Sequence, residues 1–255
     1  MTFALPSPRC FLIPLALALG APACSQADPA TDGPPTPGAG AGGAAGAGAT
    51  GGGGAGATGC SSLGSGTPDH FPLADGASWT YRHMGVAGGD WDETIDMAAT
   101  TFGGAPAFLT VDTPDSLGVH DESVLVRQGT GTLRVHREEY TSGSLSLVVE
   151  YVPGFARFDE AWLTAGGPVL TTYSRTEADA FGSVLSVNQR EQQYTVLATG
   201  ECVQVPAGTF LTVKIERLRI DTQDRTLYWF ADGVGKVREE QLDGSVEELV
   251  SYNIP

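Results

Sequence analysis

The amino-acid sequence predicts an all-β fold, either a strongly curved antiparallel sheet or an incomplete β-barrel, behind a disordered Gly-rich linker. Segments of alternating apolar and polar residues recur after residue 70, and short turn sequences such as Ser142-Gly143 separate them. No segment keeps a sustained apolar period of about 3.6 residues, which an amphipathic helix would require. Short strands at spacings of about 8–12 residues are typical of sandwiches, barrels and curved sheets.

Residues 1–23 are expected to be a signal peptide. Arg9 precedes the apolar run FLIPLALALGA, and the following APA has the small-x-small pattern of a signal-peptidase site. The run is too short to cross a hydrocarbon core of about 30 Å as a helix. The mature chain is therefore expected to begin at Cys24.

The sequence APAC ending at Cys24 resembles the lipobox of bacterial lipoproteins, in which this cysteine is lipidated. Ala21 stands where that pattern favours Leu, so plain secretion after the same cleavage is the alternative. Ser25, rather than Asp, after the cysteine resembles lipoproteins sorted to an outer membrane. The resemblance implies an exported outer-membrane lipoprotein, facing the periplasm or the cell surface, whose partner is the membrane that holds its lipid anchor.

Residues 24–67 are expected to form a disordered, lipid-anchored linker that is rich in Gly, Ala and Pro. Such a segment cannot bury enough apolar surface to offset the entropy of ordering its backbone. Residues 68–255 have an ordinary composition and a length that suits one domain. We expect this part to be the antiparallel β domain.

The strands of this domain are predicted in order along the chain, with hairpin turns at residues 129–132 and 142–143. They cover residues 79–82, 94–102, 108–111, 123–127, 133–140, 145–152, 172–175, 184–188 and 192–198. Residues 177–181 are expected to make one helical turn.

The stretch 201–239 is expected to complete the sheet with a strand, a bulge and a closing hairpin. Leu211, Val213 and Ile215 alternate with polar residues, whereas Leu218 and Ile220 fall on the opposite parity. That change of parity predicts a β-bulge near Glu216-Arg217. Residues 227–230 and 246–252 are the last two predicted strands, and the turn between residues 232 and 235 is rich in glycine.

Two cysteines remain after the signal peptide and the lipidation site are set aside. Cys60 ends the linker and Cys202 lies in the β domain. Because exported proteins enter an oxidising compartment, we expect a disulfide between Cys60 and Cys202, and two separate thiols are the alternative. Their spacing does not resemble that of a metal site.

Charge and motif content exclude several functions. The net charge is −16, with 14 Lys and Arg against 30 Asp and Glu, which disfavours nucleic acid as a partner. Neither GxSxG nor HExxH occurs, so no enzyme, metal site or cofactor is expected. The four histidines, His70, His83, His120 and His136, are scattered, and residues 136–139 read as a solvated strand face. The acidic loop 112–122 is a weak candidate for calcium.

Three short motifs carry a resemblance to a known family. They are FPLADGASWTY at residues 71–81, VPAGTF at 205–210 and YWFADGVG at 228–235. Together they resemble the TapB-like family, exported bacterial β-rich proteins of unknown role. The resemblance implies an incomplete antiparallel barrel, similar to periplasmic lipoprotein carriers, and it brings no catalytic residues.

Two functions follow as hypotheses from this reading. The first is an envelope lipoprotein whose concave sheet binds or carries a lipid or another apolar ligand, and the second is a structural or protein-interaction lipoprotein without a ligand pocket. An apolar cavity of at least about 300 Å³ would favour the first. No residue of the sequence identifies the ligand.

Overall fold

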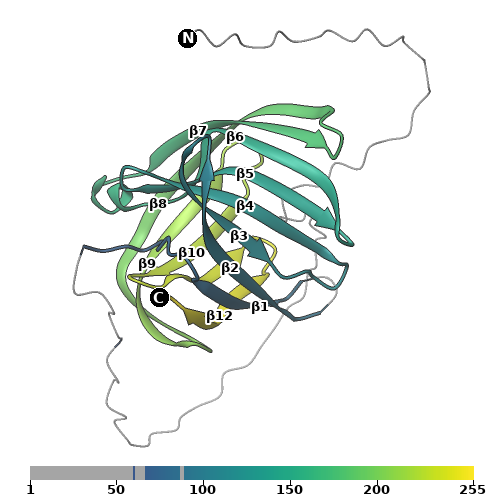
Figure 1. Ribbon diagram of the computed structural model, residues 1–255. Coiled ribbons are helices and arrows are strands. Elements are labelled where there is room, and N and C mark those ends of the chain that lie inside the picture. Colours follow the sequence, from purple (N-terminus) through teal and green to yellow (C-terminus); the bar gives the residue numbers. More distant parts are fainter. Residues whose placement is uncertain (1–59, 61–66, 87–88) are drawn as a thin grey trace, which may run out of the picture. The chain divides into compact units, whose positions relative to one another are not determined.

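The computed structural model describes residues 60, 67–86 and 89–255, and it confirms the all-β prediction. Twelve strands form one closed antiparallel barrel, in which each strand pairs with its neighbours in sequence and β1 also pairs with β12 (Figure 1). The sheet thus closes on itself as an up-and-down barrel instead of stopping at a curved sheet. The predicted signal peptide, Cys24 and most of the linker lie outside the described residues.

The strands have the following bounds, and one short 3-10 helix, η1, follows β6. They are β1 (Ser78–Met84), β2 (Trp91–Phe102), β3 (Ala105–Asp112), β4 (Val119–Gln128), β5 (Gly131–Thr141), β6 (Ser144–Asp159), η1 (Glu160–Thr164), β7 (Val169–Asp179), β8 (Val184–Val205), β9 (Gly208–Arg219), β10 (Arg225–Ala231), β11 (Gly235–Gln241) and β12 (Val246–Asn253). Among the described residues, no helix is long and apolar enough to cross a membrane.

The bulge predicted near Glu216-Arg217 is wrong in its position. Strand β9 pairs with β10 without a shift, and the register shifts lie in β8, between Val196 and Ala198 and between Thr199 and Glu201. Gly200, at φ 80°, takes the left-handed conformation there. The extra residues of β8 lie opposite residues 212–215 of β9, and the ladder at Glu216-Arg217 has no shift.

The helical turn predicted for residues 177–181 is also wrong. Glu177 and Asp179 belong to β7, and a hairpin turn joins this strand to β8. The Asp179 carboxylate accepts hydrogen bonds from the backbone N–H groups of Phe181 and Ser183. A turn of this kind satisfies the backbone locally, so the short polar segment forms a hairpin and no helix.

The segment before β1, residues 67–77, lies across one end of the barrel, and we call it the plug segment. Its Asp69 carbonyl accepts from Gly233 N–H in the β10–β11 turn, and its Asp69 carboxylate pairs with Arg127 of β4. Its His70 contacts Glu160 of η1 at 2.9 Å. These partners come from different sides of the barrel, so the plug segment crosses this end of it. Its Phe71 and Leu73 pack against the core.

The core fills the barrel around the plug segment. Trp79, Val234, Val237 and Leu249 are buried in the largest cluster, and the Trp79 indole N–H donates to the Val234 carbonyl at 2.7 Å. A second cluster holds Phe158, Trp162, Tyr194, Ile215 and Phe230. A disulfide joins Cys60 to Cys202 of β8, with Cα atoms 5.9 Å apart, and so ties the chain before the plug segment to the barrel wall.

Candidate functional site

A cavity of about 80 Å³ lies inside the barrel, below the plug segment. Its apolar wall comes from Phe71, Pro72, Trp79, Ile95, Met97 and Leu125, and its charged wall from Asp112, Arg134, Arg157 and Lys236. The lining belongs to β1 to β6, β11 and the plug segment, so the cavity is enclosed on most sides by the sheet. It is smaller than the roughly 300 Å³ of a typical pocket for a drug-sized ligand.

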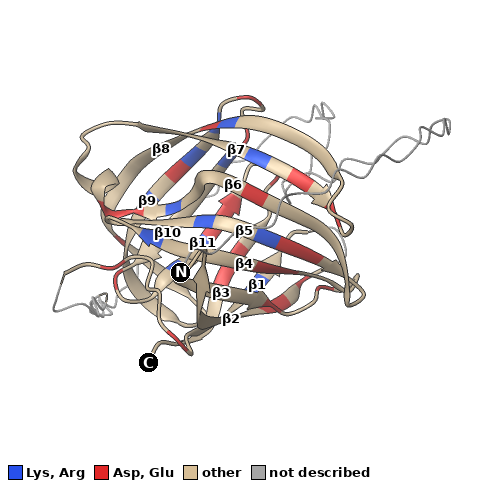
Figure 2. Ribbon diagram, turned by 45° about the horizontal axis from the view of Figure 1, so that its top comes forward, with Lys and Arg blue, Asp and Glu red and all other residues tan. Residues whose placement is uncertain are grey.

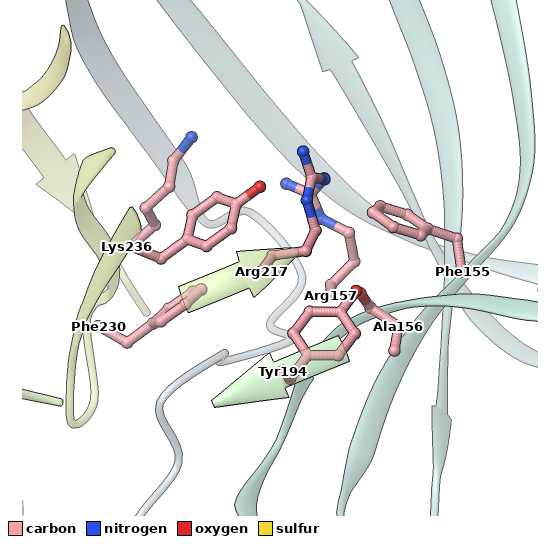
Figure 3. Close-up of a pocket in the computed structure, with 8 residues that line it drawn as sticks. Phe155, Ala156, Arg157, Tyr194, Arg217, Phe230 and Lys236 are labelled. Carbon is pink, nitrogen blue, oxygen red and sulfur yellow. The ribbon is translucent and has the colours of Figure 1, made fainter. Parts of the chain in front are cut away.

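A smaller hollow adjoins this cavity across the side chains of Arg157 and Lys236, which line both spaces. Figure 3 shows the guanidinium groups of Arg157 and Arg217 close together in it. Both groups also lie against the Phe155 ring, at 5.8 and 5.7 Å from its centroid. The two spaces therefore share a cationic wall that aromatic side chains support.

The strand register explains why two of these arginines face inward. Arg134 of β5 lies directly opposite Phe155 of β6, and Arg157 comes two residues after Phe155 on the same strand. Arg134 and Phe155 share a face because they lie directly opposite in the ladder, whereas Arg157 is the extra residue of a bulge in β6, and both arginines line the cavity. Arg134 and Arg157 consequently project into the same part of the barrel.

The guanidinium groups of Arg134 and Arg157 differ from those of other arginines in lacking a carboxylate partner among the described residues. Basic and acidic positions lie next to one another along β5 and β7 (Figure 2), and Arg137 pairs with Asp121 at 3.0 Å. Within the part of the chain that the structure describes, the side chains of Arg134 and Arg157 form no ion pair and no hydrogen bond. The Arg134 Nε is buried without a hydrogen-bond partner, and the Arg157 guanidinium lies over the rings of Phe71 and Phe155.

Electrostatics in this region follow from burial and from the neighbouring charges. Burial lowers the pKa of Arg157, and the charge of Arg134 lowers it further. Burial, followed by the charges of Glu93 and Asp121, raises the pKa of the Asp112 carboxyl well above its usual range. The charges of Arg134 and Arg157 act against this rise, and with Lys236 they place three cationic side chains beside one carboxyl group in the cavity wall.

The residues singled out from the sequence do not assemble into one site. His70 pairs with Glu160, His120 stacks on Tyr140, and His136 lies between Glu138 and Glu150. His83, on β1 where this strand pairs with β12, lies near Glu93 and Glu247.

The acidic loop considered for calcium spreads its carboxylates among different partners. Asp112 lies at the cavity, Asp115 accepts the backbone N–H groups of Leu117 and Val119, and Asp121 pairs with Arg137. This arrangement gives the loop a structural role in the turn before β4.

Sequence reasoning missed Arg134 and Arg157. The signal was present for Arg157, which stands between Phe155 and Phe158 in the strand segment GFARF. A lone arginine among aromatic residues predicts a buried or cavity-facing cation, but it does not tell whether a carboxylate lies opposite.

No protein-family model matches the chain, and no curated protein matches it. Among solved structures, the chain is similar to a "putative exported protein with YmcC-like fold" from Bacteroides fragilis, with 14% identity over 72% of this chain and 98% of that chain and a TM-score of 0.39. A "putative lipoprotein" from Parabacteroides distasonis has 16% identity over 73% of this chain and 99% of that chain, with a TM-score of 0.35. The TapB-like resemblance stays a prediction.

Proposed function

We propose that this protein is an exported binding module, held to the outer membrane by a lipid on Cys24, whose barrel takes a small acid with an apolar part. The observation that carries the proposal is the pair Arg134 and Arg157, which lines the cavity without a carboxylate partner among the described residues. The pair acts by binding, and we propose no catalytic role for it.

The excess of acidic residues in the chain makes two arginines without a carboxylate partner unexpected. Acidic side chains outnumber basic ones by 30 to 14, yet two of the guanidinium groups face the interior unpaired. An unpaired buried charge costs several kcal/mol, and arginine keeps its proton in proteins. A carboxylate or phosphate on a ligand supplies the missing counter-charge and accepts the guanidinium N–H groups in a bidentate geometry.

The rest of the wall specifies the other part of the ligand. Trp79, Met97 and Leu125 are buried and give the cavity an apolar lining beside the charged side chains. The volume of about 80 Å³ suits an acid of a few heavy atoms and falls short of what a long acyl chain needs. This replaces the expectation of a purely apolar ligand on a concave sheet with that of a small amphipathic anion inside a barrel.

The test is ligand binding by the mature protein and by one charge variant. Native mass spectrometry of protein extracted from its own membrane looks for a co-purified acid, and calorimetry then compares short-chain carboxylates with the matching neutral amides. Arg157→Met keeps an apolar stem of similar length and removes the charge. We expect it to weaken carboxylate binding at least tenfold.

Arg82→Met is the matched control, because Arg82 is partly exposed and pairs with Asp92 at 2.8 Å on the surface. We expect this variant to bind the acid as the unaltered protein does. Amides that bind as tightly as acids would overturn the anionic ligand. Absence of binding by any acid to the folded protein would favour the structural or protein-interaction alternative.

The membrane anchor has its own test, since it rests on the sequence of the first 25 residues. Labelling of cells with palmitate is expected to mark the protein, and Cys24→Ala is expected to abolish the label. Incorporation that survives Cys24→Ala would contradict the anchor while leaving the ligand proposal untouched.

A further inference from the structure

A histidine and two glutamates from three neighbouring strands come together where β1 closes the barrel. In strand register His83 of β1 lies directly opposite Glu247 of β12 and directly opposite Trp91 of β2. Glu93 follows Trp91 by two residues, so it points to the same face of the sheet. The seam thus brings these side chains together, although residues 83 and 247 lie far apart in sequence.

The donor atoms of this group are close enough to share one ion. His83 Nε2 lies 3.2 Å from Glu93 Oε2, and His83 Nδ1 lies 3.9 Å from Glu247 Oε2. One donor atom from each of the three residues falls within 4.8 Å of the others. The side chains of His83, Glu93 and Glu247 expose only 18%, 16% and 12% of their surface, so water screens the carboxylate charges only weakly.

We propose that His83, Glu93 and Glu247 bind a divalent metal cation of the zinc type through one imidazole nitrogen and two carboxylate oxygens. Nitrogen and oxygen ligands lie about 2.0–2.2 Å from Zn²⁺, so donors around one ion stand roughly 3–3.5 Å apart. The present separations approach this spacing, and small side-chain rotations complete it. Calcium fits less well because it prefers six to eight oxygen ligands.

The orientation of the imidazole is fixed before any ion binds. The His83 ring stacks on the Trp91 ring with centroids 4.3 Å apart and planes 7° apart. A ligand held in one orientation loses less side-chain entropy on binding. Trp91 therefore acts as a positioning residue for this site.

Lys236 lies beside the group and contacts one carboxylate oxygen of Glu247. Its ammonium lies 2.5 Å from Glu247 Oε1 and 2.8 Å from Glu239 Oε2. Glu247 thus uses Oε1 toward Lys236 and turns Oε2 toward His83.

His136 provides a comparison within the same chain. It also lies between two glutamates, with Nδ1 2.6 Å from Glu150 and Nε2 3.3 Å from Glu138, but these carboxylates are 46% and 31% exposed. In the described part of the chain, only the His83 group brings three donor atoms within 4.8 Å. His136, as buried as His83 but flanked by more exposed carboxylates, is thus present as a matched control.

Equilibrium dialysis of the mature protein, stripped with a chelator and then offered Zn²⁺, Mn²⁺ or Ca²⁺, tests the proposal. We expect one equivalent of Zn²⁺, with affinity lowered at least tenfold in His83→Ala and unchanged in His136→Ala. Glu93→Gln keeps the side-chain shape and is expected to weaken Zn²⁺ binding as well, which guards against misfolding of His83→Ala.

Three results would overturn the site: no Zn²⁺ bound by the folded protein, equal binding by His83→Ala, or a preference for Ca²⁺ over Zn²⁺. The site does not depend on the acid ligand. Arg157→Met is therefore expected to retain Zn²⁺, and loss of acid binding leaves this result unaffected.

Discussion

Asp112, at the end of β3, shows how single residues set the chemistry of the barrel interior. Burial, and then the charges of Glu93 and Asp121, raise its pKa well above the usual range of a carboxyl group. A carboxyl whose folded-state pKa exceeds the unfolded value binds its proton more tightly in the folded state. Its contribution to stability is therefore complete below the unfolded pKa and is lost as the pH rises through the folded pKa.

Asp112→Asn is expected to stabilise the protein at neutral pH, because the amide keeps the shape and removes the penalty of a buried carboxylate. The gain is expected to shrink below about pH 4, where the carboxyl is protonated in both states. Urea unfolding at pH 7.5 and at pH 4 measures the difference. Asp90→Asn, at an exposed position, is the control, and a loss of stability in Asp112→Asn at pH 7.5 would mean that an ionised Asp112 supports Arg134 and Arg157.

The sequence predicts the type of environment of a residue better than it predicts which residues it contacts. Pairing of Cys60 with Cys202 follows from the two cysteines that remain in an exported chain, and the structure contains that disulfide. The inward direction of Arg134, and the meeting of His83 with Glu247, depend on strand register across the closed sheet. Register between distant strands leaves no local pattern, so these sites became visible only in the fold.

At the scale of elements, alternation located most strands because each has one face toward the core. The misplaced bulge and the divided strand share a cause, which is that local irregularities do not end a strand. Strand β8 runs over 22 residues and joins the predicted strands 184–188 and 192–198 to residues 201–205. Its register shifts near Gly200 absorb the extra residues while the ladder with β9 continues, so a turn-like sequence does not mark an end.

Gly154 in β6 is expected to be required by close packing against β5. A Cβ at this position would lie 2.9 Å from the Leu133 Cβ and 3.0 Å from its Cδ1, closer than carbon atoms approach. Gly154→Ala should therefore cost about 1–3 kcal/mol as the two strands separate. Urea denaturation gives the value, and Gly167→Ala, where a Cβ meets nothing within 4 Å, should change stability little. Equal stability of both variants would show that Leu133 moves aside freely.

At the scale of the whole molecule, closure of the barrel is the feature that the sequence left open. The choice between an incomplete and a closed barrel depends on pairing between β1 and β12, whose partners Ser78 and Asn253 come from opposite ends of the domain. Both strands were predicted, but residues 246–252 were expected to form an edge strand, which is wrong because β12 pairs with both β1 and β11. Nothing in either strand specifies the other. Closure removes the exposed sheet edges that would otherwise pair with other chains, and it assembles the His83 group.

Leu249 is expected to be a main contributor to that closure. Its side chain is fully buried, it faces Tyr81 across the β1–β12 ladder, and its carbonyl accepts from the Ala207 N–H at 3.0 Å. Leu249→Ala should lower the free energy of unfolding by about 2–5 kcal/mol, because a close-packed interior collapses only in part around the lost methyl groups. Leu242→Ala, at a position 71% exposed, should change it by less than about 0.5 kcal/mol. Calorimetric unfolding of both variants measures the difference, and a Leu249→Ala protein as stable as Leu242→Ala would mean that the seam between β1 and β12 contributes little to holding the barrel closed.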